Sequence, residues 1–195
     1  MAAQLQMSAS EKANFSHLVG DIAWFGLAMA ATSRFLSVYA IRLGATPADL
    51  GWISALPALL LLISASFGTW WARRYGNPVR SLFWPGVGMR LMFLLPAFAP
   101  FLPPHLQPAW LILSVSLPAL PQGIASVVFF VIMRGSIDPA HMTRLLSRRQ
   151  LAVNVCVAIG ALAFGVRLKG VPFPLNYQVM FLVAFLLSLG SLYHC

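Results

Sequence analysis

The sequence predicts an all-α polytopic membrane protein with six transmembrane helices, and three observations lead to that prediction. Of the 195 residues, 59% are hydrophobic and only 9% are charged, whereas soluble domains have about 25% charged residues. Long apolar runs divide the chain, and each is close to the roughly 20 residues that a helix needs to cross the hydrocarbon core. Short arginine-rich segments separate some of these runs. The lipid interior rejects arginine, and cytoplasmic loops collect it.

We predict the position of each span from an apolar run and from the charged or polar residues at its two ends. The six spans lie at about 18–41, 49–71, 81–101, 107–133, 150–167 and 176–194. Residues 1–17 are expected to form a cytoplasmic N-terminal segment, and residues 18–195 one six-helix transmembrane bundle. Prolines inside such spans are tolerated, and we expect kinks near Pro57, Pro96 and Pro118.

The distribution of lysine and arginine predicts which side faces the cytoplasm. One side of the predicted bundle carries Lys12, Arg73, Arg74, Arg80, Arg134, Arg144, Arg148 and Arg149, and the other carries Arg42, Arg167 and Lys169. The positive-inside rule places the richer side in the cytoplasm. We therefore expect both termini to be cytoplasmic and the chain to be integral to a membrane, the plasma (inner) membrane of a bacterium.

The titratable residues form no pattern that is typical of catalysis or metal binding. The four acidic residues, Glu11, Asp21, Asp49 and Asp138, stand outside helical contact distance of one another. The histidines show no HxxxH or HExxH spacing, and the two cysteines form no CxxC. We therefore expect no enzyme activity, no catalytic residue, no metal site and no cofactor. The net charge of +9 follows the membrane topology, so no nucleic-acid partner is expected.

Three charged residues, Asp21, Arg34 and Arg90, fall away from the ends of predicted spans, where a lone charge is costly. An intramembrane arginine costs about 2.5–3.5 kcal/mol on insertion scales, so it pairs, faces a cavity or snorkels to the interface. Arg34 lies two-thirds of the way through the first span, where a cavity and snorkelling are both open. Arg90 lies near the middle of the third span, too deep to snorkel. We expect an internal ion pair between Asp21 and Arg90, with a structural role favoured over proton coupling.

Uncharged polar and small residues inside the spans have two interpretations. Gln122 and Ser126 in the fourth span and Asn154 in the fifth can offer hydrogen bonds to a cavity, although such side chains more often bond to each other. Small residues at helical spacing favour close helix packing. They are Gly51, Ala55, Ala58, Ser64 and Gly68 in the second span, and Gly160 and Gly165 in the fifth.

One stretch of the chain resembles a known family. The run RLGATPADLGWISALPALLLLISASFGTWWARRYGNPVR at 42–80 resembles the first external loop, second helix and next cytoplasmic loop of major facilitator superfamily transporters. That family carries a Gly followed by an Asp-Arg-x-Gly-Arg-like run. Gly68 begins the run here, Arg74 and Gly76 match its Arg-x-Gly, Arg80 supplies the following basic residue, and Arg73 stands at the acidic position. The segment with Arg144, Arg148 and Arg149 resembles the family's turn between helices four and five.

The resemblance implies the N-terminal six-helix half of a major-facilitator-type fold, built from two inverted three-helix repeats. It implies secondary transport of a small solute, with the lipid bilayer and a second six-helix bundle, a second copy or other membrane subunits as partners. Arg34, Gln122, Ser126 and Asn154 are then expected to line the pathway, with Arg34 as the anchor for an anionic group. The alternative is a non-transporting scaffold or accessory subunit of a larger membrane complex, which the degenerate loop motif and the few intramembrane polar groups favour.

Overall fold

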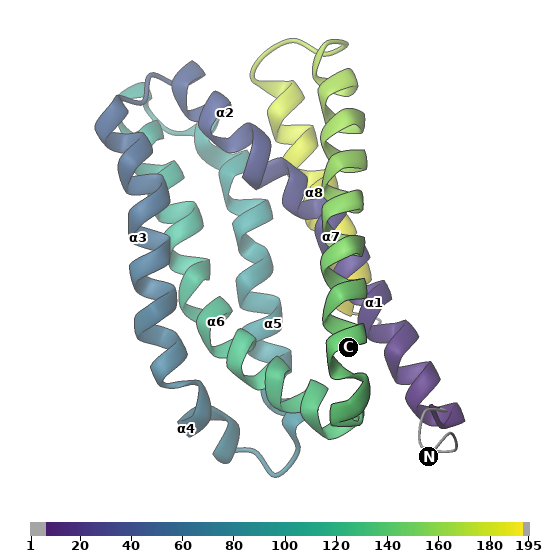
Figure 1. Cartoon of the computed structure of the whole chain (residues 1–195). Coiled ribbons are helices and arrows are strands. Elements are labelled where there is room, and N and C mark those ends of the chain that lie inside the picture. Colours follow the sequence, from purple (N-terminus) through teal and green to yellow (C-terminus); the bar gives the residue numbers. More distant parts are fainter. Residues whose placement is uncertain (1–6, 193–195) are drawn as a thin grey trace.

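The chain is all-helical over residues 7–192, which are the residues that the structure, a computed structural model, describes (Figure 1). Six helical segments are long and apolar enough to cross a membrane. They are Ala9–Arg42, Pro47–Ser66, Val79–Phe101, Pro104–Ser136, Pro139–Leu168 and Leu175–Leu192. The prediction of an all-α membrane protein with six spans is confirmed.

Several spans contain more than one helical element. In chain order the elements are α1 (Ala9–Ala30), the π-helical turn η2 (Ala31–Phe35), α2 (Leu36–Arg42), α3 (Pro47–Ser66), α4 (Gly68–Arg73), α5 (Pro78–Leu94), the 3-10 helix η3 (Leu95–Phe101), the 3-10 turn η4 (Pro104–Leu106), α6 (Gln107–Ser136), α7 (Pro139–Leu168) and α8 (Leu175–Leu192). The first span is therefore α1, η2 and α2 in sequence. The third span changes from α- to 3-10 helix at Leu95, beside Pro96, which has no amide hydrogen to donate.

Two helices, α1 and α7, start two turns or more before the predicted spans, and a capping residue precedes each. Helix α1 begins at Ala9, where the Ser8 side chain accepts a hydrogen bond from the Glu11 amide at 3.1 Å. Residues 9–17 are thus continuous with the first span and not a separate segment. Helix α7 begins at Pro139, with Asp138 as its N-cap. The second arginine segment is therefore the start of a helix and not a loop.

The predicted second span ends early, and part of the first arginine segment is helical too. Helix α3 stops at Ser66, and the short helix α4 follows over Gly68–Arg73. The indole of Trp71 donates a hydrogen bond to the Ser81 carbonyl at 2.9 Å and so joins α4 to α5. Only residues 74–77 remain as a non-helical turn.

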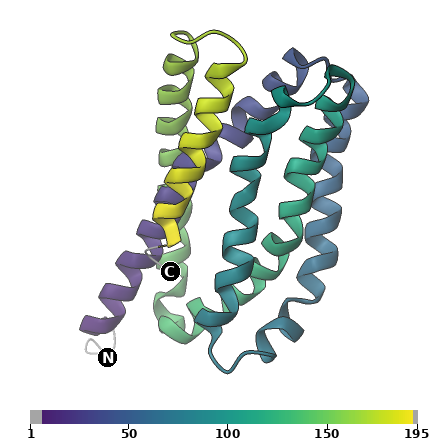
Figure 2. The same ribbon diagram turned by 180° about the vertical axis from the view of Figure 1, so that it is seen from behind.

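The spans pack in a pattern that repeats within the chain (Figures 1 and 2). The most extensive contacts join α1 to α7, α3 to α6, α1 to α8, α5 to α6, and α5 to α8. The six spans in order are formed mainly by α1, α3, α5, α6, α7 and α8. Suppose that each of the first three is exchanged with its counterpart in the second half, α1 with α6, α3 with α7 and α5 with α8. The contact α1–α7 then becomes α6–α3, α1–α8 becomes α6–α5, and α5–α8 stays the same. The two halves of the chain therefore use equivalent helices for equivalent contacts.

Small residues allow the paired helices to approach closely. The sequence predicts this role for several small residues, and the structure shows it for some of them. A Cβ on Gly123 of α6 would lie 2.5 Å from the Leu61 carbonyl of α3, and one on Gly160 of α7 would lie 2.8 Å from the Leu27 carbonyl of α1. A Cβ on Gly68 would lie 2.6 Å from the Cβ of Val127 on α6. No atom of the described chain lies within 4 Å of a Cβ built on Gly51, so Gly51 does not bring two helices of this bundle together.

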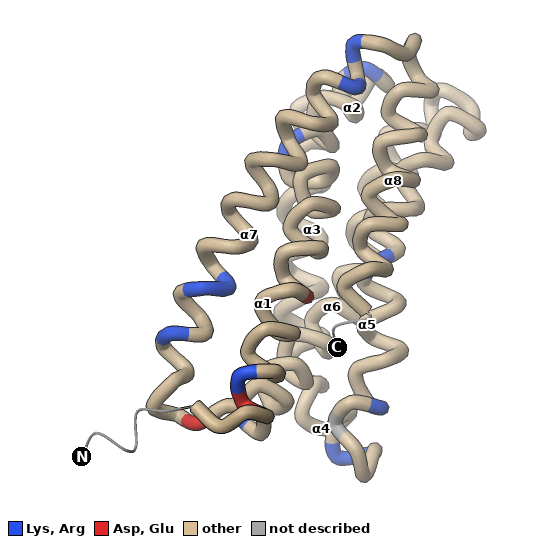
Figure 3. Tube along the Cα trace, turned by 90° about the vertical axis from the view of Figure 1, so that its right-hand side faces the viewer, with Lys and Arg blue, Asp and Glu red and all other residues tan. Residues whose placement is uncertain are grey.

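The charged residues lie mostly at the two ends of the bundle (Figure 3). Arginines cluster at the end that holds α4 and along the first turns of α7, and a smaller group lies beyond α2 at the opposite end. In that second group the Arg42 guanidinium lies 5.7 Å from the centre of the Tyr177 ring. Few charged residues lie between the two ends of the bundle, so each one that does needs an explanation.

Candidate functional site

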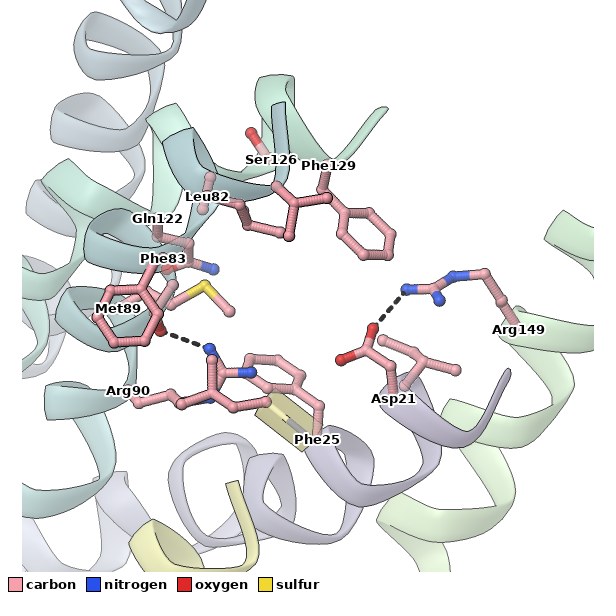
Figure 4. Close-up of a pocket in the computed structure, with 15 residues that line it drawn as sticks. Asp21, Phe25, Leu82, Phe83, Met89, Arg90, Gln122, Ser126, Phe129 and Arg149 are labelled. Carbon is pink, nitrogen blue, oxygen red and sulfur yellow. Dashed lines mark hydrogen bonds and ion pairs between the residues drawn. The ribbon is translucent and has the colours of Figure 1, made fainter. Parts of the chain in front are cut away.

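A cavity of about 320 Å³ lies among α1, α5, α6, α7 and α8 (Figure 4). Its position is near the end of the bundle with α4, because the residues that line it come from the first turns of α5 and the last turns of α6. Its apolar walls come from Phe25, Leu82, Phe83, Met89 and Phe129. The polar groups that line the cavity lie on α1, α5, α6 and α7.

Arg90 of α5 is the most deeply buried charged residue at this cavity, with 2% of its surface exposed. Its Nε donates to the Ser188 carbonyl at 2.8 Å, Nη2 donates to Ser191 Oγ at 2.6 Å, and Nη1 donates to the Gly86 carbonyl. A guanidinium carries five N–H donors and is stable inside a protein only when acceptors surround it. These bonds therefore hold α5 against α8.

Asp21 of α1 is the acidic residue of the same site and is 6% exposed. Its Oδ1 accepts a hydrogen bond from Ser191 Oγ at 2.5 Å, and its Oδ2 forms an ion pair with Arg149 Nη2 of α7 at 3.3 Å. Arg149 Nη1 also donates to the Leu18 carbonyl. Arg90, Ser191, Asp21 and Arg149, here called the Asp21 cluster, thus connect α5, α8, α1 and α7 in one polar chain.

An aromatic ring completes the surroundings of Arg149. Its guanidinium carbon lies 4.6 Å from the centre of the Phe129 ring of α6, a geometry that attracts a cation to the ring face. The cluster therefore contacts helices of five of the six spans, and the second span, formed by α3, contributes no residue to it.

The structure places Asp21 and Arg90 at the same cavity, where both bond to Ser191. The direct ion pair between them stays a prediction. Two other members differ from the sequence expectation. Arg149 was predicted only as part of a cytoplasmic loop motif, but it is the ion-pair partner of Asp21. Ser191 was not predicted. Its signal in the sequence is the pair of serines at 188 and 191, three residues apart in a stretch, 179–192, that is otherwise apolar.

Two of the four predicted pathway residues lie at the cavity, and the other two lie on the outer surface of the bundle. Gln122 and Ser126 line the cavity. Arg34 and Asn154 are exposed and lie outside it. Within residues 7–192, neither of these two side chains has a hydrogen-bond or ion-pair partner. The structure thus separates a cavity inside the bundle from polar groups on its outer surface.

Comparison with known protein families, curated proteins and solved structures finds no match for this chain. The major-facilitator assignment therefore stays a prediction.

The remaining residues of the predicted loop motif lie at the surface. Arg73, Arg74, Gly76, Arg80, Arg144 and Arg148 are exposed, and Gly68 is buried against α6. Arg74 lies over the Trp70 ring at 5.4 Å. Over residues 7–192, no group of three His, Cys, Asp or Glu side chains is placed to hold a metal ion. The polar chemistry of the described site is that of guanidinium, carboxylate, hydroxyl and amide groups.

Proposed function

We propose that this chain is one six-helix bundle of a major-facilitator-type secondary transporter and moves a small solute together with a second bundle. The observation that carries the proposal is the packing pattern, which stays the same when the first three spans are exchanged in order for the last three. Three successive crossings reverse the direction of the chain, so the second set runs opposite to the first. Inverted repeats of this kind are a feature of many secondary transporters.

The exposed polar residues on the first and fifth spans support a shared pathway. Arg34 and Asn154 would face hydrocarbon if lipid covered them, and an arginine at such a position costs about 2.5–3.5 kcal/mol. The helices α3 and α7 have the smallest buried shares of the six spans, 11% and 17%, so much of their surface is open to a partner. A second bundle that encloses water against this surface would solvate Arg34 and leave room for a solute.

A cysteine at Ser33 is expected to react with a small, charged thiol reagent in native membranes, because Ser33 is exposed beside Arg34 and would line the proposed aqueous pathway. The background carries Cys156→Ala and Cys195→Ser. The matched control is Leu186→Cys on α8, a helix outside the proposed pathway, where Leu186 is 65% exposed. It lies at a similar depth, because Phe181 packs against Tyr39 and Gly190 lies beside Trp24, and Ser33 lies between Trp24 and Tyr39 on the first span. This control is expected to face lipid and to react at least tenfold more slowly.

The two alternatives give different labelling patterns. Equal, slow reaction at both positions would contradict a water-filled pathway. If the cysteine at position 33 does not react with the thiol reagent and instead cross-links to an unrelated protein, the result would support the scaffold or accessory subunit.

We also propose that the end of the bundle with α4 is cytoplasmic. Single cysteines at Gly76, which has open space around it, and at exposed His105 test this orientation. With an impermeant maleimide on intact cells, His105→Cys is expected to label and Gly76→Cys to label only after permeabilisation, because the arginine-rich side stays inside. The opposite pattern would reverse the orientation.

A further inference from the structure

Gln122 is an unusual side chain in the wall of the cavity. Its amide lines the cavity together with Met89 and Phe83 (Figure 4). Among residues 7–192 the amide has no hydrogen-bond partner. An amide that lines a mostly apolar cavity without a protein partner keeps its donors and its acceptor available to a ligand, and hydrogen bonds to charged groups are stronger than those between neutral groups. A bound molecule with a polar group would satisfy it.

The charged groups at the cavity define the sign of that polar group. Two guanidiniums, Arg90 and Arg149, and one carboxylate, Asp21, line it. All three have partners within the protein, and their formal charges add to +1. A single negative charge brought into the cavity would balance this sum in a medium of low dielectric constant, where charge balance matters most. A cation would add to the excess instead.

The size and walls of the cavity define the rest of the ligand. A volume of about 320 Å³ is at the small end of the range for small-molecule pockets, about 300–1,000 Å³. Phe25, Phe83 and Phe129 give aromatic walls, which bind hydrocarbon or aryl groups. Exposed Val79, Phe83 and Ser126 are among the lining residues, so the cavity is reachable from the surface.

We propose that this cavity is a binding site for a small amphipathic monoanion. The anionic head lies toward Gln122 and the arginines of the Asp21 cluster, and the apolar body lies against the phenylalanines. The site does not depend on the proposed transport function, because all its residues belong to this one chain.

Octanoate is a suitable probe, and octanol, with the same chain length and no charge, is its control. The purified full chain in phosphatidylcholine nanodiscs is expected to bind radiolabelled octanoate saturably and at least tenfold more tightly than octanol. Gln122→Leu is expected to weaken octanoate binding about tenfold, because a hydrogen bond to a charged group is lost. The matched control Gln150→Leu, an exposed position outside the cavity, is expected to bind like the wild type.

A second variant tests whether octanoate binds in the cavity, and a second lipid tests whether a lipid headgroup occupies it. Ser126→Phe, which places bulk at the cavity, is expected to abolish saturable octanoate binding while thermal stability stays close to that of the wild type. Equal binding of octanol, or wild-type affinity in Gln122→Leu and Ser126→Phe, would overturn the proposal. Loss of octanoate binding when phosphatidylglycerol replaces part of the phosphatidylcholine would show that a lipid headgroup occupies the cavity and would equally overturn it.

Discussion

Replacing Gly123 with valine is expected to prevent α3 and α6 from packing and to destabilise the bundle by about 3 kcal/mol or more, the upper end of the range for overpacked cores. A Cβ at this position would lie 2.5 Å from the Leu61 carbonyl and 2.9 Å from the Ala65 amide nitrogen. These are backbone atoms of α3, so no side-chain rotation relieves the clash. Thermal unfolding in detergent, followed by the reaction of Cys156 with a fluorogenic thiol dye, measures the effect.

Gly51→Val is the matched control for this prediction. Gly51 also lies on a spanning helix, but no atom lies within 4 Å of its added Cβ. The change is expected to alter the unfolding temperature only slightly. Equal losses in the two variants would mean that β-branching in a helix, and not the close approach of α3 and α6, determines the result.

Arg90→Leu is expected to cost about 3–5 kcal/mol, the range for breaking a buried charge network by removing one partner. The change removes the donors to the Ser188 carbonyl and to Ser191 Oγ. It also leaves Asp21 with less positive charge around it, although Arg149 remains. The same thiol-reactivity assay measures the unfolding temperature, and yield in the membrane fraction gives an independent estimate of folding.

Two further variants test whether geometry or charge matters. Arg80→Leu removes an exposed arginine ten positions earlier and is expected to leave the free energy of unfolding within about 0.5 kcal/mol of the wild type. Arg90→Lys keeps the charge but lacks the planar fork, so it is expected to recover only part of the loss. A fully stable Arg90→Leu protein would show that the Asp21 cluster contributes little to folding.

The sequence predicts the number of spans correctly because an apolar helix of bilayer length has few other stable environments. It predicts helix ends less well, and α7 shows the reason. The first turns of this helix carry Arg144, Arg148 and Arg149, so hydropathy marks them as a loop. Their helical form depends on the Asp138 cap and on Pro139, which are local features that hydropathy does not measure.

The site was only partly predictable because its contacts depend on tertiary packing. Asp21 and Arg149 are separated by 128 positions, and nothing in either local sequence selects the other. The sequence marked Asp21 and Arg90 as costly to bury, and that argument holds for any buried charge. It could not separate Gln122, at the cavity, from Asn154, on the outer surface, since both are lone amides in apolar spans.

The Asp21 cluster also constrains the order in which the protein can be made. Arg90 bonds to groups 98 and 101 positions further along the chain, and Asp21 bonds to a hydroxyl 170 positions away. During synthesis the first and third spans enter the membrane long before α8 exists. Their charged side chains must therefore be held by water, lipid headgroups or the insertion machinery until α8 arrives. The sixth span thus closes the bundle.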